Sequence, residues 1–400
     1  MKILFVLGFP NPFAGAAWTR IGFLSETWSK QGFAVDVLGT FTPNTLNQRG
    51  SKLFRNRTSI FNIIPSIYLD NYPLGFVINS FTSFLASTFF LVAKRPNVAI
   101  VSVPTGDAGL GSIMACKIAR IKYIIDYRDE WEDYASSKFN GGNPKWFYQL
   151  LKKSMAHLYI KSCLTITVTS TFLSNLKCRG VTNIALMPNG ADTSVFRPFN
   201  KSETRKKLNL AESDFVIVYS GIIGEYYKLD IIIKTMANIR GSTGSFKLLL
   251  VGEGPDLPAL QKLSTSLGLN DSVLYLGVKN NLYDVAEIIS ASDVGIIPGI
   301  YSKGQVAVKF FEYCACGVPV IAIAPNDSDI AHIISEYKVG LTIPSIGENE
   351  LAKAIHKLYT DIPFRVDAEK RARVLIEEKF DRKKTAQQYL ELINELNIKC

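Results

Sequence analysis

Histidine is scarce in this chain, and its cysteines lack the spacings that metal and redox sites use. The three histidines are His157, His332 and His356, and no pair has ligand spacing, which argues against a histidine-based metal centre. No two cysteines form a C-x-x-C pair, which excludes the usual zinc and thioredoxin-like patterns and favours a reducing cytosol. The six cysteines are Cys116, Cys163, Cys178, Cys314, Cys316 and Cys400.

The sequence does not predict a secretory signal peptide, and its one long uncharged stretch is a poor membrane span. The apolar start, 1–9, is interrupted by Pro10 and Pro12 and has no small-residue cleavage site, so it predicts a first strand. Residues 74–93 carry no charge and are long enough to cross a bilayer. Because Asn79 and several Ser and Thr interrupt them, we expect a helix that is buried or partly dipped into a membrane.

Acidic residues are few in the first half of the chain. Residues 1–200 hold 21 Lys and Arg against 10 Asp and Glu, whereas residues 201–400 hold 24 against 25. The whole net charge of +10 therefore originates in the first half. A basic half suggests an anionic partner, such as a membrane surface, a lipid phosphate or a nucleic acid, or else a merely soluble basic domain.

Short apolar runs alternate with longer helical stretches along the whole chain. Nearly continuous apolar strands predict parallel sheets that are covered on both faces, so each half predicts one doubly wound, Rossmann-like α/β domain with six strands. We place the domains at 1–198 and 199–380, and we expect the last helix, 381–400, to pack back on the first. Two such facing domains would bind ligands across a cleft, at the carboxyl ends of their strands. The expected strands begin at Lys2, Ala34, Val98, Tyr123, Leu164, Asn183, Phe215, Phe246, Ser272, Val294, Val318 and Val339.

Two segments of the first half follow expected strands and carry candidate functional groups. Gly15 precedes a helix whose small first residues would let a phosphate approach the N-terminal amides, although a turn glycine explains it equally well. The segment DYRDEWEDY, 126–134, brings five carboxylates, among them Asp129, to the expected cleft edge. It could supply a base or bind hydroxyls, or it could be a capped loop.

Three segments of the second half are candidates for a donor site. The turn SGIIGEYYKLD, 220–230, contains Gly221 and places Lys228 near a helix start, where a cation could neutralise a diphosphate. VGEGP, 251–255, is another glycine-rich turn after a strand. In AVKFFEYCACGVPVIAI, 307–323, Glu312 is the only carboxylate of an apolar helix. Burying it is costly without a hydrogen-bond partner, and a ribose would supply one; a solvated glutamate is the alternative.

Two basic and aromatic stretches lie in the first half. One surrounds Leu53 and Phe54, and the other is KWFYQLLKKSMAHLY, 145–159. Both suit a peripheral membrane face, and a solvated loop and helix are the alternatives. The basic residues assigned to this face are Arg49, Lys52, Arg55, Arg57, Lys152 and Lys153.

Taken in order, these landmarks resemble glycosyltransferase family 4, the retaining GT-B enzymes, over nearly the whole chain. The form of 309–313, Lys-x-x-Glu-Tyr, is similar to the branch that builds bacterial surface polysaccharides. The matching segments are Gly15, DYRDEW, MPNGADTSVFRP, SGIIG…KLD, LLLVGEGPDLPALQ, VLYLGV, ASDVGIIP and VKFFEYCACGVPVIA.

The resemblance implies site residues, with two departures. It implies that Glu312 holds the ribose hydroxyls, that Lys228 and the amides near Gly15 hold the diphosphate, and that the backbone at Val278 meets the base. The family's arginine after the first glycine of the second domain is missing, since Ile222 and Glu225 are the candidates there. The family's first glutamate, eight residues before Glu312, is Gly304, and Lys303, Gln305 or Lys309 could substitute. The family's catalytic-pocket histidine has no evident counterpart.

The resemblance further implies transfer of a hexose from a nucleotide-diphosphate sugar with retention of configuration. It implies no metal or other cofactor, a saccharide or lipid-linked acceptor, no nucleic acid, and a cytoplasmic location at the inner face of the plasma membrane. The expected pathway is capsule, lipopolysaccharide or exopolysaccharide synthesis, with Lys228 and Asp129 as catalytic candidates. Two alternatives are a UDP-sugar 2-epimerase of the same fold and a non-catalytic partner subunit with a degenerate donor site.

Overall fold

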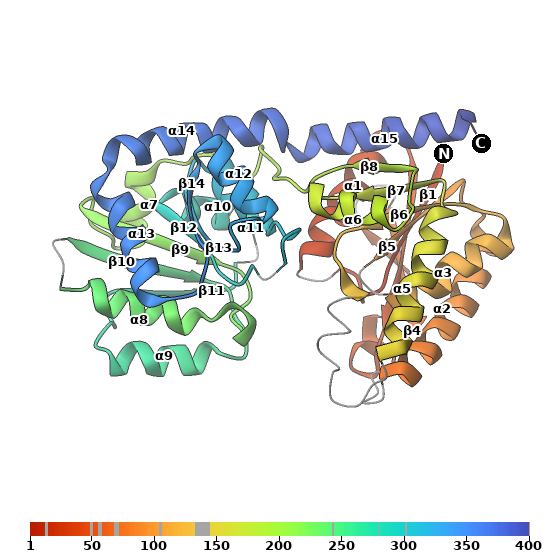
Figure 1. The fold of residues 1–400 in the computed structure, drawn as a ribbon, viewed down its shortest axis with the longest axis horizontal. Helices are drawn as coiled ribbons and strands as arrows, with labels where there is room; N and C mark the ends of the chain where they lie inside the picture. Colours follow the sequence, from red (N-terminus) through yellow and green to blue (C-terminus); the bar gives the residue numbers. More distant parts are fainter. Residues whose placement is uncertain are drawn as a thin grey trace. The chain divides into compact units, whose positions relative to one another are not determined.

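The computed structural model describes most of the chain and divides it into two compact units (Figure 1). It describes residues 1–12, 15–48, 51–54, 58–67, 72–103, 106–132, 145–241, 244–279, 281–300 and 302–399. Unit 1 comprises Met1–Pro188 together with Ala386–Cys400, and unit 2 comprises Asn189–Thr385.

The first boundary between the units falls before the expected join at 198–199. The segment after Pro188 packs into unit 2, because Ala191 forms a β-bridge with Asp381 and Phe196 is buried in a core of that unit. At the other end of the chain, the last helix belongs to unit 1 from Ala386 onward. There Tyr389 packs edge-on against Trp28, with ring centroids 5.5 Å apart.

Both units are built from strands that alternate with helices. The strands of unit 1 are β1 (Lys2–Leu7), β2 (Ala34–Phe41), β3 (Ser51–Phe54), β4 (Thr58–Pro65), β5 (Val98–Val103), β6 (Lys122–Tyr127), β7 (Leu164–Thr167) and β8 (Ile184–Leu186). Those of unit 2 are β9 (Asp214–Ser220), β10 (Ser245–Val251), β11 (Val273–Gly277), β12 (Val294–Ile297), β13 (Val320–Ile323) and β14 (Gly340–Ile343).

The helices cover both faces of each sheet. In unit 1 they are α1 (Ala16–Lys30), η1 (Pro43–Gln48), α2 (Tyr72–Lys94), α3 (Gly106–Ala119), α5 (Lys145–Ile160) and α6 (Ser170–Cys178). In unit 2 they are α7 (Lys201–Lys207), η2 (Glu225–Tyr227), α8 (Leu229–Ile239), α9 (Leu257–Ser266), α10 (Leu282–Ser290), α11 (Val308–Ala315), α12 (Asp329–Tyr337), α13 (Glu348–Thr360) and α14 (Ile362–Lys379). The last helix, α15 (Arg382–Lys399), begins in unit 2 and ends in unit 1.

The sheet of unit 1 has the order β3-β4-β2-β1-β5-β6-β7-β8, and only β3 runs antiparallel to its neighbour. Successive residues of β1 serve opposite cores: Leu4 and Val6 pack with α2, α3 and α5, whereas Ile3 and Phe5 pack with α1 and α15. The expectation of six strands is wrong here, because β3 and β4 form an edge hairpin. The basic stretch around Leu53 is therefore partly strand.

The sheet of unit 2 is entirely parallel and has the order β11-β10-β9-β12-β13-β14. All six strands expected from the sequence are present. Numbered within the unit, the order is that of a doubly wound nucleotide-binding sheet, so the predicted α/β fold is confirmed. Helices α8, α9 and α13 cover one face, and α10, α11, α12 and α14 cover the other. The order reverses between β9 and β12, where such sheets bind their ligands.

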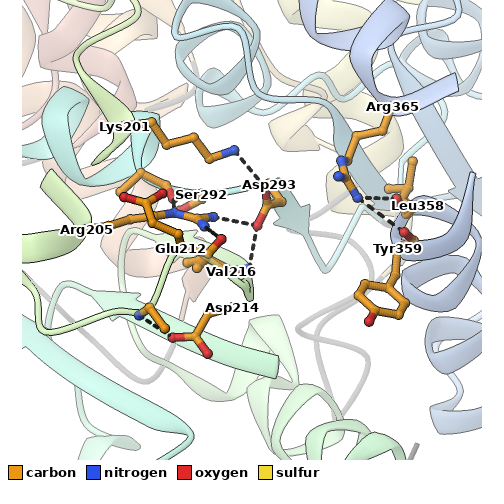
Figure 2. A network of polar contacts seen from close by, with 12 residues as sticks. Lys201, Arg205, Glu212, Asp214, Val216, Ser292, Asp293, Leu358, Tyr359 and Arg365 are labelled. Carbon is orange, nitrogen blue, oxygen red and sulfur yellow. Dashed lines mark hydrogen bonds and ion pairs between the residues drawn. The ribbon is translucent and has the colours of Figure 1, made fainter. Parts of the chain in front are cut away.

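An ion-pair network joins β9 and β12 at their amino ends (Figure 2). Asp293, just before β12, accepts hydrogen bonds from Arg205 Nη2 at 2.8 Å, Lys201 Nζ at 2.7 Å and the amide of Val216 at 2.7 Å. Arg205 also donates to the carbonyl of Glu212 at 2.8 Å. Because ligands bind at the opposite, carboxyl edge of such sheets, we assign this network a structural role.

Candidate functional site

The best candidate site lies at the carboxyl edge of the unit 2 sheet, at the reversal between β9 and β12. The loop after β9 begins at Gly221, and the loop after β12 leads into α11, which begins at Val308. Lys309, in the first turn of α11, reaches back across the reversal to the β9 loop. This edge is where a fold of this kind places ligands.

Two glycine-rich loops pack closely together at this edge. The amide of Gly221 donates to the carbonyl of Val251 at 2.9 Å, and the amide of Ile223 donates to that of Glu253 at 2.9 Å. Gly252 has a φ of +134°, and a Cβ there would stand 2.0 Å from the Gly221 carbonyl oxygen. A larger residue at 252 would therefore push the loops apart. The weak VGEGP signal thus corresponds to a structural requirement.

Lys309 is the most unusual cation of this edge. Its Nζ lies 4.1 Å from the ring centroid of Tyr219 and 4.6 Å from that of Tyr227. A Cβ placed on Gly221 would stand 3.3 Å from the same Nζ, so the amine faces the glycine directly. Burial lowers the pKa of Lys309 to about 7, although the carboxylate of Glu312 partly opposes the shift. Two aromatic rings thus hold an ammonium group that carries little hydration of its own.

Glu312 lies one turn further along α11 and is partly buried. No side chain of the described residues donates a hydrogen bond to its carboxylate. Burial raises the pKa of Glu312, and the positive charges of Arg382 and Lys309 oppose that shift. Its neighbour Tyr313 instead faces the sheet, where its hydroxyl accepts a hydrogen bond from the amide of Ser220 at 2.8 Å. The carboxylate therefore keeps its acceptor capacity for a ligand.

The other donor-site candidates of unit 2 differ in how exposed they are. Lys228 has a left-handed backbone (φ 49°) at the start of α8, and its exposed Nζ lies 3.9 Å from a carboxylate oxygen of Glu225. Val278 follows β11 and is exposed. Gly304 is buried in the turn before α11. Their roles remain predictions.

In unit 1, Gly15 precedes α1 as expected. Its backbone is extended (φ −175°), a conformation open to any residue, and its carbonyl accepts hydrogen bonds from the amide and hydroxyl of Thr19, both at 3.0 Å. The first turn of α1 contains no acidic residue. The binding of a diphosphate by the amides near Gly15 stays a prediction.

The carboxylates of the DYRDEW segment differ in their surroundings. Asp126 is fully buried between Arg20, at 3.3 Å, and Arg128, at 3.4 Å. Glu130 and Glu132 are bound by side chains of the fold, Asn175, Tyr127, Tyr159 and Arg179 among them. Asp129 is exposed, and its carboxylate accepts a hydrogen bond from the neighbouring Glu130 amide at 2.9 Å. Among the four described carboxylates of this segment, Asp129 is thus the exposed one.

The predicted basic face is described only in part. Arg49, Arg55 and Arg57 lie outside the described residues, and Lys52 belongs to β3. Lys153 is exposed on α5, and Lys152, on the same helix, is partly buried.

The described ranges contain no cluster of three or more His, Cys, Asp or Glu that could hold a metal ion. Ser328, between Asp327 and Asp329, caps α12: its Oγ accepts a hydrogen bond from the amide of Ala331 at 3.3 Å. Asp327 pairs with Lys303.

Three site residues were not predicted from the sequence. Tyr219 ends an apolar strand, Tyr227 lies in a turn, and Arg382 is far along the chain from Glu312. Their types suggest core or surface positions, and only the fold brings them to α11. The Tyr-Tyr pair of 226–227 before a lysine was the one available signal.

Comparison with known proteins gives one family match and many structural matches. Residues 200–375 match the model of glycosyl transferases group 1. The chain is 31% identical over 192 residues to a D-inositol 3-phosphate glycosyltransferase of Stackebrandtia nassauensis. This alignment covers 46% of the chain and 42% of that relative, so the chain matches less than half of the relative's length.

Solved structures share the fold over the whole chain. A sucrose-phosphate synthase of Thermosynechococcus elongatus superposes with a TM-score of 0.79 at 19% identity, covering 100% of both chains. HepE of Anabaena, solved with UDP-glucose, gives a TM-score of 0.72 at 18% identity, covering 99% of this chain and 100% of that one. Residues 200–375, less than half of the chain, thus match the glycosyl transferases group 1, and the chain as a whole has the GT-B fold of solved glycosyltransferases.

Proposed function

We propose that this chain is a retaining glycosyltransferase. It moves a hexose from a nucleotide-diphosphate sugar to a saccharide or lipid-linked acceptor, in the synthesis of a bacterial surface polysaccharide. The group 1 match over unit 2 and the UDP-glucose bound to HepE support a nucleotide-sugar donor. The surface-polysaccharide role rests on the resemblance of the motifs, above all on the Lys-x-x-Glu-Tyr form of 309–313.

The observation that carries the proposal is the position of Lys309 and Glu312 on the same turn of α11. The carboxylate has free acceptor positions, which suit the two hydroxyls of a ribose. The ammonium group faces the glycine loop after β9, where a diphosphate can approach the backbone. At this spacing, the Glu312 carboxylate fits the ribose of a nucleoside diphosphate and the Lys309 ammonium group fits its phosphates.

Lys309 also accounts for the missing arginine of the resemblance. The residues that could replace it by position, Ile222 and Glu225, are exposed and offer no cation. Lys309 supplies a positive charge to the same loop from another element. This geometry favours an active transferase over a subunit with a degenerate donor site.

The proposed reaction breaks the bond between the anomeric carbon and the diphosphate oxygen. The acceptor hydroxyl forms the new bond on the same face, and its proton goes to the departing diphosphate. No protein nucleophile is required. Lys309, Lys228 and the amides near Gly15 would stabilise the negative charge that develops on the leaving group. Neither a metal nor another cofactor takes part in this proposal.

Unit 1 would bind the acceptor, and Asp129 is its candidate catalytic carboxylate. Its basic character suits a cytoplasmic enzyme at the anionic inner face of the plasma membrane, and Lys152 and Lys153 would contribute to this attraction. A nucleic acid is not part of the proposal.

Binding and transfer assays on purified variants test the proposal. The Kd values of UDP, GDP and their sugars would be measured by calorimetry, and transfer would be followed with polyprenyl-diphosphate acceptors. We expect Lys309→Ala and Lys228→Asn to lose most transfer activity while they remain folded; asparagine suits the left-handed backbone at 228. Lys234→Ala is the matched control, since Lys234 is an exposed lysine that pairs with Asp230 on its own helix, α8.

Each other outcome has a defined meaning. Wild-type transfer by both lysine variants would contradict the assigned roles. Turnover of a UDP-sugar to its 2-epimer without an acceptor would replace the transferase by the epimerase. Nucleotide binding without transfer to any acceptor or hydrolysis of any donor would indicate the non-catalytic partner.

A further inference from the structure

Helix α2 of unit 1 exposes an unbroken apolar stripe. Its members recur every three or four residues and are 51–74% exposed: Leu74, Val77, Phe81, Leu85, Phe89 and Val92. This spacing places them on one side of the helix, over a length of about 27 Å at 1.5 Å per residue. Monomeric soluble proteins rarely leave such a continuous apolar surface in water.

The opposite side of α2 is fixed to unit 1 by polar contacts. The Asn79 side chain accepts a hydrogen bond from the amide of Ile67 at 2.8 Å and donates one to its carbonyl at 2.9 Å. Ser83 and Ser87 both bond to Ser112 of α3, at 3.0 and 2.9 Å. A Cβ on Gly111 would stand 2.2 Å from the Ser80 carbonyl oxygen, so the two helices are in close contact.

These contacts decide between two uses of the helix. By length and composition, residues 73–94 could span a bilayer, and theirs is the one such helix in the described part of the chain. Leaving unit 1 to do so would expose Ser83, Ser87 and Asn79 and would open the core that Phe76, Phe90 and Leu91 share with α3 and α5. If α2 instead lies on a membrane surface with its stripe facing the lipid, all of these contacts are kept.

The charges around the stripe are almost all positive. Helices α2 and α5 contain no acidic residue, and α3 contains only Asp107, whose carboxylate accepts hydrogen bonds from Asn79 and the Ala108 amide. Figure 1 shows α2 and α3 side by side. Basic residues within these three helices or directly after them include Lys94, Arg95, Lys117, Arg120, Lys152, Lys153 and Lys161.

The neighbouring helices add exposed apolar side chains of their own. Ile118 of α3 is 62% exposed, and Trp146 of α5 is 64% exposed. The ring of Phe147, beside Trp146, packs against Phe76 of α2 with centroids 6.1 Å apart, so the start of α5 adjoins α2. Tryptophan at such a position is typical of the boundary between lipid and water.

Charge decides which partner covers the stripe. A second copy of the chain would bring two sets of cations together, with no described carboxylate of α2 or α5 to pair with them. An anionic phospholipid surface meets both features at once, since it accepts apolar side chains and attracts a basic rim.

We propose that α2 lies flat on an anionic phospholipid bilayer, with its stripe inserted at the level of the headgroups and the surrounding lysines and arginines on the lipid phosphates. This inference deepens the membrane-facing part of the proposed function. It assigns the apolar contact to α2 and specifies the side chains that would make it. It does not depend on the chemistry in unit 2.

Flotation with vesicles tests the inference on the full chain. We expect the wild type to float with phosphatidylglycerol–phosphatidylcholine vesicles at low salt, and to float at least tenfold less with phosphatidylcholine alone. The double variant Phe81→Glu/Phe89→Glu should lose flotation on both. Its melting temperature should stay near that of the wild type, because both rings are exposed. The matched control is Ile362→Glu/Val374→Glu, which adds the same charge to exposed apolar positions of α14.

The remaining outcomes overturn the inference or support it. Equal flotation of the wild type and the α2 double variant would overturn it. A concentration-dependent dimer that the α2 variant abolishes, with no vesicle binding by the wild type, would assign the stripe to a second copy. If the double variant does not fold, Phe89→Trp with brominated lipids decides: quenching of its fluorescence supports insertion, and unchanged fluorescence contradicts it. Calorimetric titration with nucleotides on the same preparations reports separately on the proposed function.

Discussion

Lys309 Nζ lies 4.1 Å above the centre of the Tyr219 ring, across the point at which the strand order of unit 2 reverses. The two residues come from α11 and from the end of β9. Their contact fixes the amine at the one edge of the sheet where the fold places ligands. The rings also remove water from the ammonium group, which strengthens its attraction to a diphosphate. The same contact makes stability depend on pH.

Lys309 is expected to make unit 2 more stable as the pH rises from about 7 toward 10. In the folded chain its pKa is lowered to about 7, whereas the ordinary value is 10.5. Between these values the unfolded chain binds more protons, so the free energy of unfolding increases with pH. Lys309→Met removes this contribution. The stability of Lys309→Met relative to the wild type should therefore be greatest below pH 7 and decrease by pH 10.

Urea unfolding of both proteins across this pH range measures the effect. Lys234→Met, on an exposed lysine, should keep a constant difference from the wild type. A constant difference for Lys309→Met as well would show that Lys309 titrates normally in the folded chain.

Glu312→Gln is expected to weaken nucleoside diphosphate binding about tenfold without harming the fold. A hydrogen bond from a ribose hydroxyl to a carboxylate is stronger than one to an amide, by about 1.5 kcal/mol or more. Because no described side chain donates to the Glu312 carboxylate, the amide leaves no protein group unpaired. Calorimetric titration with the nucleotide gives the Kd. Glu336→Gln, on the exposed side of α12, should bind as the wild type does; equal affinity for Glu312→Gln would rule out the ribose contact.

Gly252→Ala is expected to lower the free energy of unfolding by about 1–3 kcal/mol. The backbone there has a φ of +134°, and the new methyl would meet the Gly221 carbonyl oxygen at 2.0 Å. The displaced β9 loop should also bind nucleotide less tightly. Gly241→Ala is the control, since it meets open space and should change stability by less than about 0.5 kcal/mol. Chemical denaturation of both variants would show whether the loop contact is as tight as described.

Asp293→Ala is expected to destabilise unit 2 by about 3–5 kcal/mol, because it leaves a buried arginine without its charged partner. Arg205 is 4% exposed in its side chain and would lose its 2.8 Å partner (Figure 2). Lys207→Ala, which breaks the exposed pair with Glu287, should cost at most about 1 kcal/mol. Comparable losses for the two variants, measured by thermal unfolding, would contradict the structural role of the network.

The parallel core of both units could be predicted from the sequence, whereas the edge of unit 1 could not. Strands such as 215–220 and 246–251 are continuous apolar runs, which buried parallel strands require. The β3–β4 hairpin gives no such signal. Strand β4 alternates buried and half-buried residues, and β3 lies in a basic stretch that suggested a loop.

The residues that surround the candidate site depend on strand order, which short patterns do not reveal. Glu312 could be singled out because a carboxylate in an apolar helix contradicts its surroundings. Tyr219 and Tyr227 are ordinary residues for their local sequence and so give no signal. Only the pairing of β9 with β12 brings them to Lys309. Arg382 could not be predicted for the same reason, since it lies far from Glu312 in the sequence and only the fold lets its charge act on that carboxylate.

The division of the chain has a consequence for its synthesis. Unit 2 is continuous in sequence, but unit 1 needs Ala386–Cys400, which are synthesised after the whole of unit 2. Until they emerge from the ribosome, Trp28 lacks both the ring of Tyr389 and the carbonyl of Ala386, to which its Nε1 donates at 3.0 Å. The unit that begins first is therefore the one completed last, and a chain ending before Ala386 would keep all of unit 2 while leaving a core of unit 1 open.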